Sequence, residues 1–150
     1  MTAAVELTPE PLLAALLARG VCRALDQLGF ASLVEFPLAN GRRADILALS
    51  KDGQFIIVEI KSSVADFRAD RKWNEYRDFS DRLYFAVAEG FPAALIPEEC
   101  GLIVADGFGA AVIRDGIGAA LAPARRKALT LRFAMLAAAR LRRETDPQLF

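Results

Sequence analysis

The sequence contains no histidine among its 150 residues. This absence excludes Ser-His-Asp and Cys-His catalysis, zinc sites that require imidazole ligands, and nucleases whose general base is histidine. Any chemistry must therefore come from carboxylates, amines, hydroxyls or thiols. For hydrolysis, that restriction directs attention to carboxylates that bind hard divalent cations.

Cysteines and long apolar runs are also scarce. Cys22 and Cys100 are far apart and have no ligand-like spacing, so we expect reduced thiols rather than a disulfide framework. Arg132 interrupts the longest apolar candidate near the C-terminus, so no segment has the length that spans a bilayer. No basic segment precedes the first apolar run, which argues against a secretory signal. We expect a cytoplasmic protein without a membrane partner.

The composition is that of one globular domain over residues 1–150. Apolar residues make up 54% and charged residues 25%, as in folded rather than disordered chains. The formal net charge is zero, which by itself does not suggest nucleic acid. The segment 119–150 is nevertheless basic and contains Arg125, Arg126, Lys127, Arg132, Arg140, Arg142 and Arg143. This tail either contacts phosphates or is the solvated face of a helix.

The spacing of apolar residues predicts an α/β domain. Helices are expected over 9–28, over 64–79 and from Pro123 to about Arg143. Strands are expected over 33–38, 44–50, 55–61, 82–88, 101–105 and 110–114, the last two forming a hairpin. The element order is therefore α-β-β-β-α-β-β-β-α. No repeat, linker or low-complexity segment divides the chain.

The turn Lys51-Asp52-Gly53 determines how two of these strands pair. It suits a three-residue hairpin loop with glycine in the left-handed conformation, which pairs the two residues that flank it. Counting outward, Asp45 then lies opposite Glu59. Lys61 is two residues beyond Glu59 and shares its face of the strand. Three ionisable side chains therefore converge, whereas a two-residue loop would shift the pairing by one and separate them.

Glu59 and Lys61 interrupt a run that is otherwise typical of a buried central strand. Burying a carboxylate is costly unless it is paired or binds a metal ion. One explanation is a structural ion pair of Lys61 with Glu59 or Asp45. The other is a metal site, because two carboxylates and one amine leave one negative charge that a divalent cation would complete. We favour the site.

Ala44-Asp45, followed after the hairpin by Glu59-Ile60-Lys61, resembles the signature of the PD-(D/E)XK nuclease superfamily, with Ala44 in place of the proline. The longer segments 41–45, 58–63 and 66–73 resemble the MmcB family of bacterial DNA repair proteins. The similarity continues through 84–88 and 102–106, so it covers most of the chain. The resemblance implies a restriction-endonuclease-like core, with a central mixed β-sheet flanked by helices.

The same resemblance implies roles for the converging residues. Asp45 and Glu59 would be ligands of Mg²⁺ or Mn²⁺, with the backbone carbonyl of Ile60 as a further ligand. Lys61 would orient or deprotonate the attacking water, or stabilise charge that develops on the phosphate. A lysine between two carboxylates normally stays charged, so the electrostatic role is the better supported one.

Five further residues are candidates from their positions. Glu35, in the preceding strand, is either an additional metal ligand or an edge-strand carboxylate. Ser62 either contacts phosphate or leads into the next helix. Arg68 and Lys72 lie on that helix and either bind nucleic acid or belong to a solvated face of mixed charges. Lys72 and Trp73 would also meet a nucleic-acid backbone or base just after the site, although Trp73 suits the core.

These patterns support three functional classes. The first is metal-dependent hydrolysis of DNA phosphodiester bonds, of the endonuclease type, in DNA repair. The second is a nucleic-acid-binding module that keeps the nuclease fold and either does not cut or is activated by a partner. The third is an interaction domain whose strand-end charges are structural. DNA is the expected partner, and a repair protein or a second copy of the chain is a further candidate.

Overall fold

The structure, a computed structural model, describes residues 9–149. The predicted domain over 1–150 also includes residues 1–8 and 150, which lie outside the described residues. The prediction that there is no secretory signal concerns residues 1–8 and therefore also lies outside them. The helices are α1 (Glu10–Gln27), α2 (Val64–Ala69), α3 (Asn74–Arg77) and α4 (Pro123–Thr145), with short 3-10 helices η1 (Ala93–Leu95) and η2 (Pro147–Leu149). The strands are β1 (Ala31–Pro37), β2 (Arg43–Leu49), β3 (Phe55–Ile60), β4 (Arg82–Val87), β5 (Gly101–Ala105) and β6 (Ala110–Arg114).

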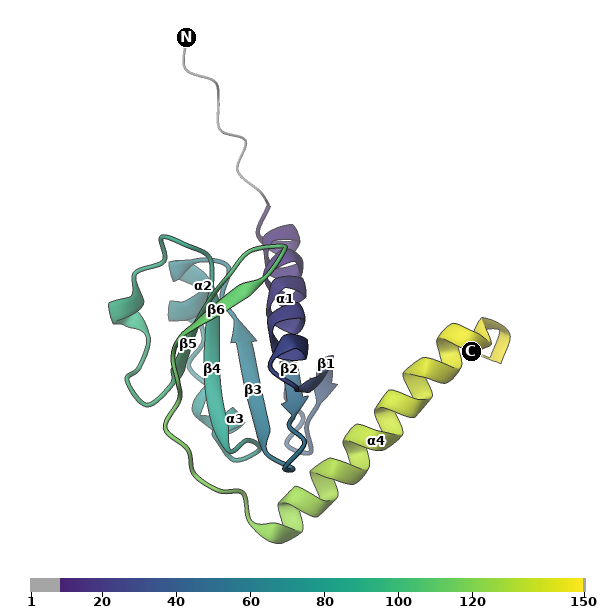
Figure 1. The fold of residues 1–150 in the computed structure, drawn as a ribbon. Helices are drawn as coiled ribbons and strands as arrows, with labels where there is room; N and C mark the ends of the chain where they lie inside the picture. The colour runs from purple at the N-terminus through teal and green to yellow at the C-terminus, as the bar shows by residue number, and fades with distance from the viewer. Residues whose placement is uncertain (1–8, 150) are drawn as a thin grey trace.

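The six strands form one mixed sheet in the order β1-β2-β3-β4-β5-β6 (Figure 1). β3, β4 and β5 are parallel, and the remaining neighbours are antiparallel. Leu17, Val21 and Leu25 of α1 pack on one face, while α2, α3 and the first half of α4 pack on the other. The sheet confirms the predicted α/β class with a central mixed sheet flanked by helices, and it is compatible with a restriction-endonuclease-like fold.

The β2–β3 hairpin has the predicted register. Gly53 has a φ of 82°, and its N–H donates to the carbonyl of Ser50 at 3.0 Å. The strands pair Leu49 with Phe55 and continue to the pair of Ile46 and Val58. One step further along the same register, Asp45 lies opposite Glu59.

The prediction of one continuous helix over 64–79 is wrong. α2 ends at Ala69 and α3 begins at Asn74. Between them, the backbone of Asp70 is extended, and its carboxylate accepts the N–H of Lys72 at 2.9 Å. Short acidic side chains compete with the helix in this way, because they offer nearby N–H groups an alternative acceptor. The periodicity of the segment did not reveal this competition.

The basic α4 runs outward from the sheet beside β1 (Figure 1). Its first half is anchored by Phe133, whose ring lies 6.1 Å from each of the rings of Phe36 and Phe55. Farther along, Arg132 and Arg140 donate to backbone carbonyls of β1. These arginines therefore cover polar groups of an edge strand.

The outer side of α4 is apolar in part. Leu131, Met135 and Leu141 are exposed there. The homodimer and the repair-protein contact expected from the sequence stay predictions. Within the described residues, no helix combines the length and the hydropathy needed to cross a membrane.

Asp81 joins α4 to the sheet. Its carboxylate forms an ion pair with Arg126 at 2.6 Å and accepts the N–H groups of Phe55 and Leu121. Burial raises the pKa of Asp81, but the Arg126 guanidinium and the two N–H groups outweigh this effect and leave the pKa below its ordinary value of 3.8.

We predict that Asp81→Ala lowers the free energy of unfolding by about 3 kcal/mol near neutral pH, because it leaves Arg126 and buried N–H groups without their acceptor. The folded-state pKa lies below the unfolded one, so this stabilisation is present above pH 3.8 and is lost as the pH falls through the folded value. Urea titrations of wild type and variant at neutral and strongly acidic pH measure the difference. A gap that widens in acid would contradict the assignment. Asp78→Ala, at an exposed carboxylate nearby, is the control.

Candidate active site

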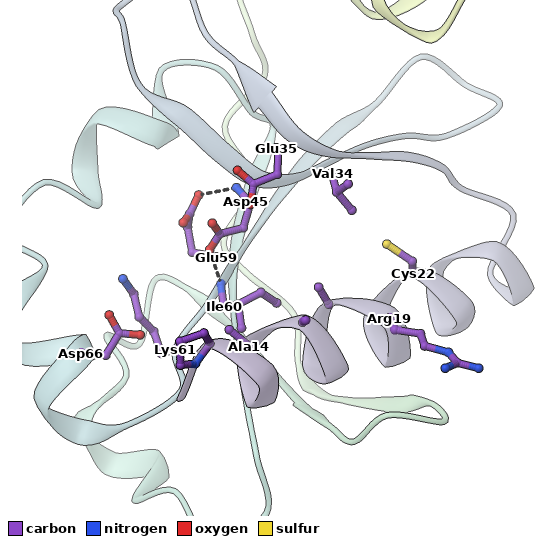
Figure 2. Close-up of a pocket in the computed structure, with 13 residues that line it drawn as sticks. Ala14, Arg19, Cys22, Val34, Glu35, Asp45, Glu59, Ile60, Lys61 and Asp66 are labelled. Atoms are coloured by element: carbon purple, nitrogen blue, oxygen red, sulfur yellow. Dashed lines mark hydrogen bonds between the residues drawn. The ribbon is translucent and has the colours of Figure 1, made fainter. Parts of the chain in front are cut away.

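Asp45 and Glu59 meet at one end of the sheet, because β2 begins where the antiparallel β3 ends (Figure 2). Glu59 is only 3% exposed. Its Oε1 accepts the N–H of Asp45 at 3.3 Å, and Asp45 Oδ2 accepts the N–H of Ile60 at 2.7 Å. Each carboxylate is thus fixed by the backbone of the opposite strand. The structure brings together the first two residues of the predicted trio.

The electrostatics of this pair are unusual. Burial, followed by the negative charge of Asp45 and a hydrogen bond with it, raises the pKa of Glu59 to about 10. Without a cation, Glu59 therefore holds a proton at neutral pH. A pair of nearby carboxyl groups of which one stays protonated is typical of functional sites.

Lys61 lies at the end of β3 and pairs with a residue that sequence reasoning missed. Its ammonium is 2.8 Å from Asp70 Oδ2, and the two side chains are only 8% and 15% exposed. The structural alternative, an ion pair of Lys61 with Glu59 or Asp45, is replaced here by an ion pair with Asp70. The signal for this contact was an acidic residue nine positions after Lys61, which the assumed continuous helix concealed.

The carboxylates open into a cavity of about 780 Å³ between α1 and the sheet. Small residues of α1 form one wall, namely Ala14, Ala15 and Ala18. Glu35, Asp45, Glu59, Lys61 and Asp66 line the opposite side together with Ile60. Arg19 also lines the cavity, but its guanidinium points away from the two carboxylates (Figure 2).

The donor set suits a hard divalent cation. Asp45 and Glu59 supply carboxylate oxygens beside a solvent-accessible cavity, and such oxygens are the ligands that Mg²⁺ and Mn²⁺ prefer. Within residues 9–149, no three acidic, histidine or cysteine side chains form a ligand cluster by themselves. A cation here would therefore need backbone and water oxygens as well, which is usual for Mg²⁺.

Glu35 lies opposite Asp45 in the β1–β2 pairing, between the pairs of Val34 and Phe36 with β2. Its Oε2 is 2.6 Å from Arg43 Nε, so its carboxylate has a partner. Its φ of 51° places a non-glycine residue in the left-handed region, which costs of order 1 kcal/mol. Arg140 of α4 donates to the carbonyls of Val34 and Glu35 and so supports this strained segment.

Of the remaining candidates, Ser62 and Trp73 have structural contacts, whereas Arg68 and Lys72 are exposed. Ser62 donates its N–H to Asp66, and Ser63 caps α2 by accepting the N–H of Asp66, so both serines help to start the helix. Trp73 packs against the ring of Phe85 at 6.1 Å. Arg68 and Lys72 are exposed, and of these two only Lys72 lines a cavity next to the carboxylates.

Comparisons with known proteins give a matching family model and a similar solved structure. The family model described as DNA repair protein MmcB-like matches residues 8–148. A solved structure of a protein of unknown function from Silicibacter pomeroyi is 44% identical, with 96% of each chain covered and a TM-score of 0.88. No curated protein matches the chain.

We predict that Asp70→Ala lowers the free energy of unfolding by about 3 kcal/mol, because it leaves the buried Lys61 ammonium without its acceptor. The double variant Asp70→Ala/Lys61→Met should lose less than Asp70→Ala alone, since it removes both charges. Chemical denaturation of the single and double variants measures this coupling. Additive losses would contradict it. Glu75→Ala breaks the more exposed Arg42–Glu75 pair and should cost less than about 1 kcal/mol.

Proposed function

Since this chain belongs to the MmcB-like family of DNA repair proteins, we propose that it hydrolyses DNA phosphodiester bonds with a divalent metal ion, as an endonuclease of the PD-(D/E)XK type. The observation that carries the proposal is the convergence of Asp45, Glu59 and Lys61 at one cavity. Two carboxyl groups and a lysine, in a chain without histidine, are consistent with metal-assisted hydrolysis.

Asp45 and Glu59 would hold Mg²⁺ or Mn²⁺, together with the backbone carbonyl of Ile60. When bound, such an ion polarises a phosphoryl oxygen and lowers the pKa of a water molecule. The protein keeps the two carboxylates in place through the N–H groups of the facing strands. Glu35 remains a candidate for an additional ligand, provided that it leaves Arg43.

Lys61 would stabilise negative charge that develops on the phosphate. Its ammonium is a donor with no acceptor atom, and its pairing with Asp70 fixes it beside Glu59. Preorganised donors of this kind act most strongly where they are withdrawn from water, and the Lys61 side chain is only 8% exposed. We therefore assign Lys61 an electrostatic role rather than that of a general base.

A second candidate function is a nucleic-acid-binding module that does not cut, or cuts only with a partner. The observation that favours it is the lining of the cavity, where the acidic residues Glu35, Asp45 and Asp66 outnumber the basic Arg19 and Lys61 even with Glu59 protonated. Such a cavity repels a phosphate until a cation is present. A chain with a net charge of zero also has less electrostatic attraction for DNA than most nucleases.

We predict that the wild type cuts labelled single-stranded, duplex, flapped or branched DNA in Mg²⁺ or Mn²⁺. Glu59→Gln and Lys61→Met should each reduce the rate by about 100-fold or more, because the first removes a carboxylate ligand of the metal ion and the second removes the cation that would stabilise charge on the phosphate. Lys51→Ala, at the exposed turn of the same hairpin, is the matched control and should keep the wild-type rate. Equal cutting by all four proteins would indicate contamination and refute the assignment.

We predict that Mn²⁺ stabilises the folded protein. At a concentration of 100 Kd, a ligand specific for the folded state contributes about 2.7 kcal/mol, which is visible as a rise in Tm. Asp45→Asn and Glu59→Gln should abolish the rise, whereas Glu75→Gln, at an exposed carboxylate, should keep it. Glu59→Gln should fold, because Glu59 already holds a proton at neutral pH. An unchanged wild-type Tm in millimolar Mn²⁺ would argue against the metal site.

A further inference from the structure

A second cavity of about 350 Å³ lies on the other side of Glu59 and Lys61. Its remaining lining comes from Arg42, Ala69, Asp70, Arg71, Lys72 and Tyr76. Glu59 and Lys61 line both cavities. The candidate catalytic position therefore lies between an acidic cavity beside α1 and this second cavity beside α2 and α3.

The second cavity is basic. Four of its lining side chains are cationic, namely Arg42, Lys61, Arg71 and Lys72. Asp70 neutralises Lys61, and Glu75 holds Arg42 at 2.7 Å. Among the residues that the structure describes, neither Arg71 nor Lys72 forms an ion pair. Two cations therefore line this cavity without an acidic partner of their own.

The break between α2 and α3 creates this arrangement. The two oxygens of the Asp70 carboxylate accept from the Lys61 ammonium and from the N–H of Lys72. The segment that follows Asp70 is thereby held next to Lys61. Arg68, on the regular part of α2, is exposed and does not line the cavity.

We propose that this cavity binds an internal phosphate of a nucleic-acid strand, next to the phosphate that is cleaved, through Arg71 and Lys72. The proposal rests on the proposed nuclease function and adds the path of the strand, from the basic cavity across Glu59 and Lys61 into the acidic one. Guanidinium and ammonium groups bind phosphate oxygens by charge-assisted hydrogen bonds. Such contacts position a strand without reading its sequence.

The test measures binding of a fluorescent single-stranded oligonucleotide by anisotropy, in EDTA so that no metal-dependent cutting occurs. Arg71→Ala/Lys72→Ala should weaken binding by roughly tenfold and make the dependence of log Kd on log salt shallower by about 0.7, the value for one neutralised phosphate on a single strand. Lys51→Ala/Lys127→Ala removes the same charge at exposed positions outside the cavity and should change Kd by less than about twofold. Arg68→Ala is a second control within the same segment.

Equal weakening by both double variants would overturn the proposal, because it would show general attraction rather than a site. Unchanged binding by Arg71→Ala/Lys72→Ala, or no binding by the wild type at low salt, would overturn it as well. The cleavage assay is separate. A wild type that binds DNA with the expected pattern but never cuts would refute the nuclease function and leave the phosphate site intact.

Discussion

The site depends on the burial of Glu59 inside β3. A carboxyl group that is 3% exposed requires compensation, and the fold supplies it through the Asp45 N–H and a retained proton. That compensation exists only in one register of the β2–β3 hairpin, because a slip by one residue would turn Asp45 to the other face. Gly53, with its φ of 82°, makes the turn that enforces this register. One glycine in a surface turn therefore determines whether two carboxylates meet.

The charged residues around Glu59 separate into two environments. Lys61 pairs with Asp70 rather than with Asp45 or Glu59. Acidic residues therefore outnumber basic ones in the cavity beside α1. Asp70 in turn ends α2 and leaves Arg71 and Lys72 on the opposite side. A chain with zero net charge thus has adjacent acidic and basic cavities. Local separation of charge, rather than net charge, is the property relevant to the proposed binding of a cation and a phosphate strand.

Elements far apart in sequence support the two ends of the sheet. Arg140, near the end of α4, holds the carbonyls on either side of the strained Glu35 backbone. At the opposite end, Asp81 and Arg126 hold the start of that helix against the first residue of β3, Phe55. The basic tail is therefore used in part to cover and anchor the sheet. Its exposed arginines are a weaker argument for DNA contact than the composition suggested.

Local patterns in the sequence were enough for the strands and for the meeting of Asp45 with Glu59. Apolar alternation and turn chemistry act over a few residues, so the β2–β3 register and the strands of the β5–β6 hairpin were predicted correctly. Tertiary structure alone decided the partner of Lys61, the break at Asp70, the strain at Glu35 and the reach of Arg140. The first two arise because a buried ammonium must find an acceptor in space, and satisfying it outweighs the helical preference of a short segment. The spacing of residues along the chain does not show which carboxylate will accept from the Lys61 ammonium.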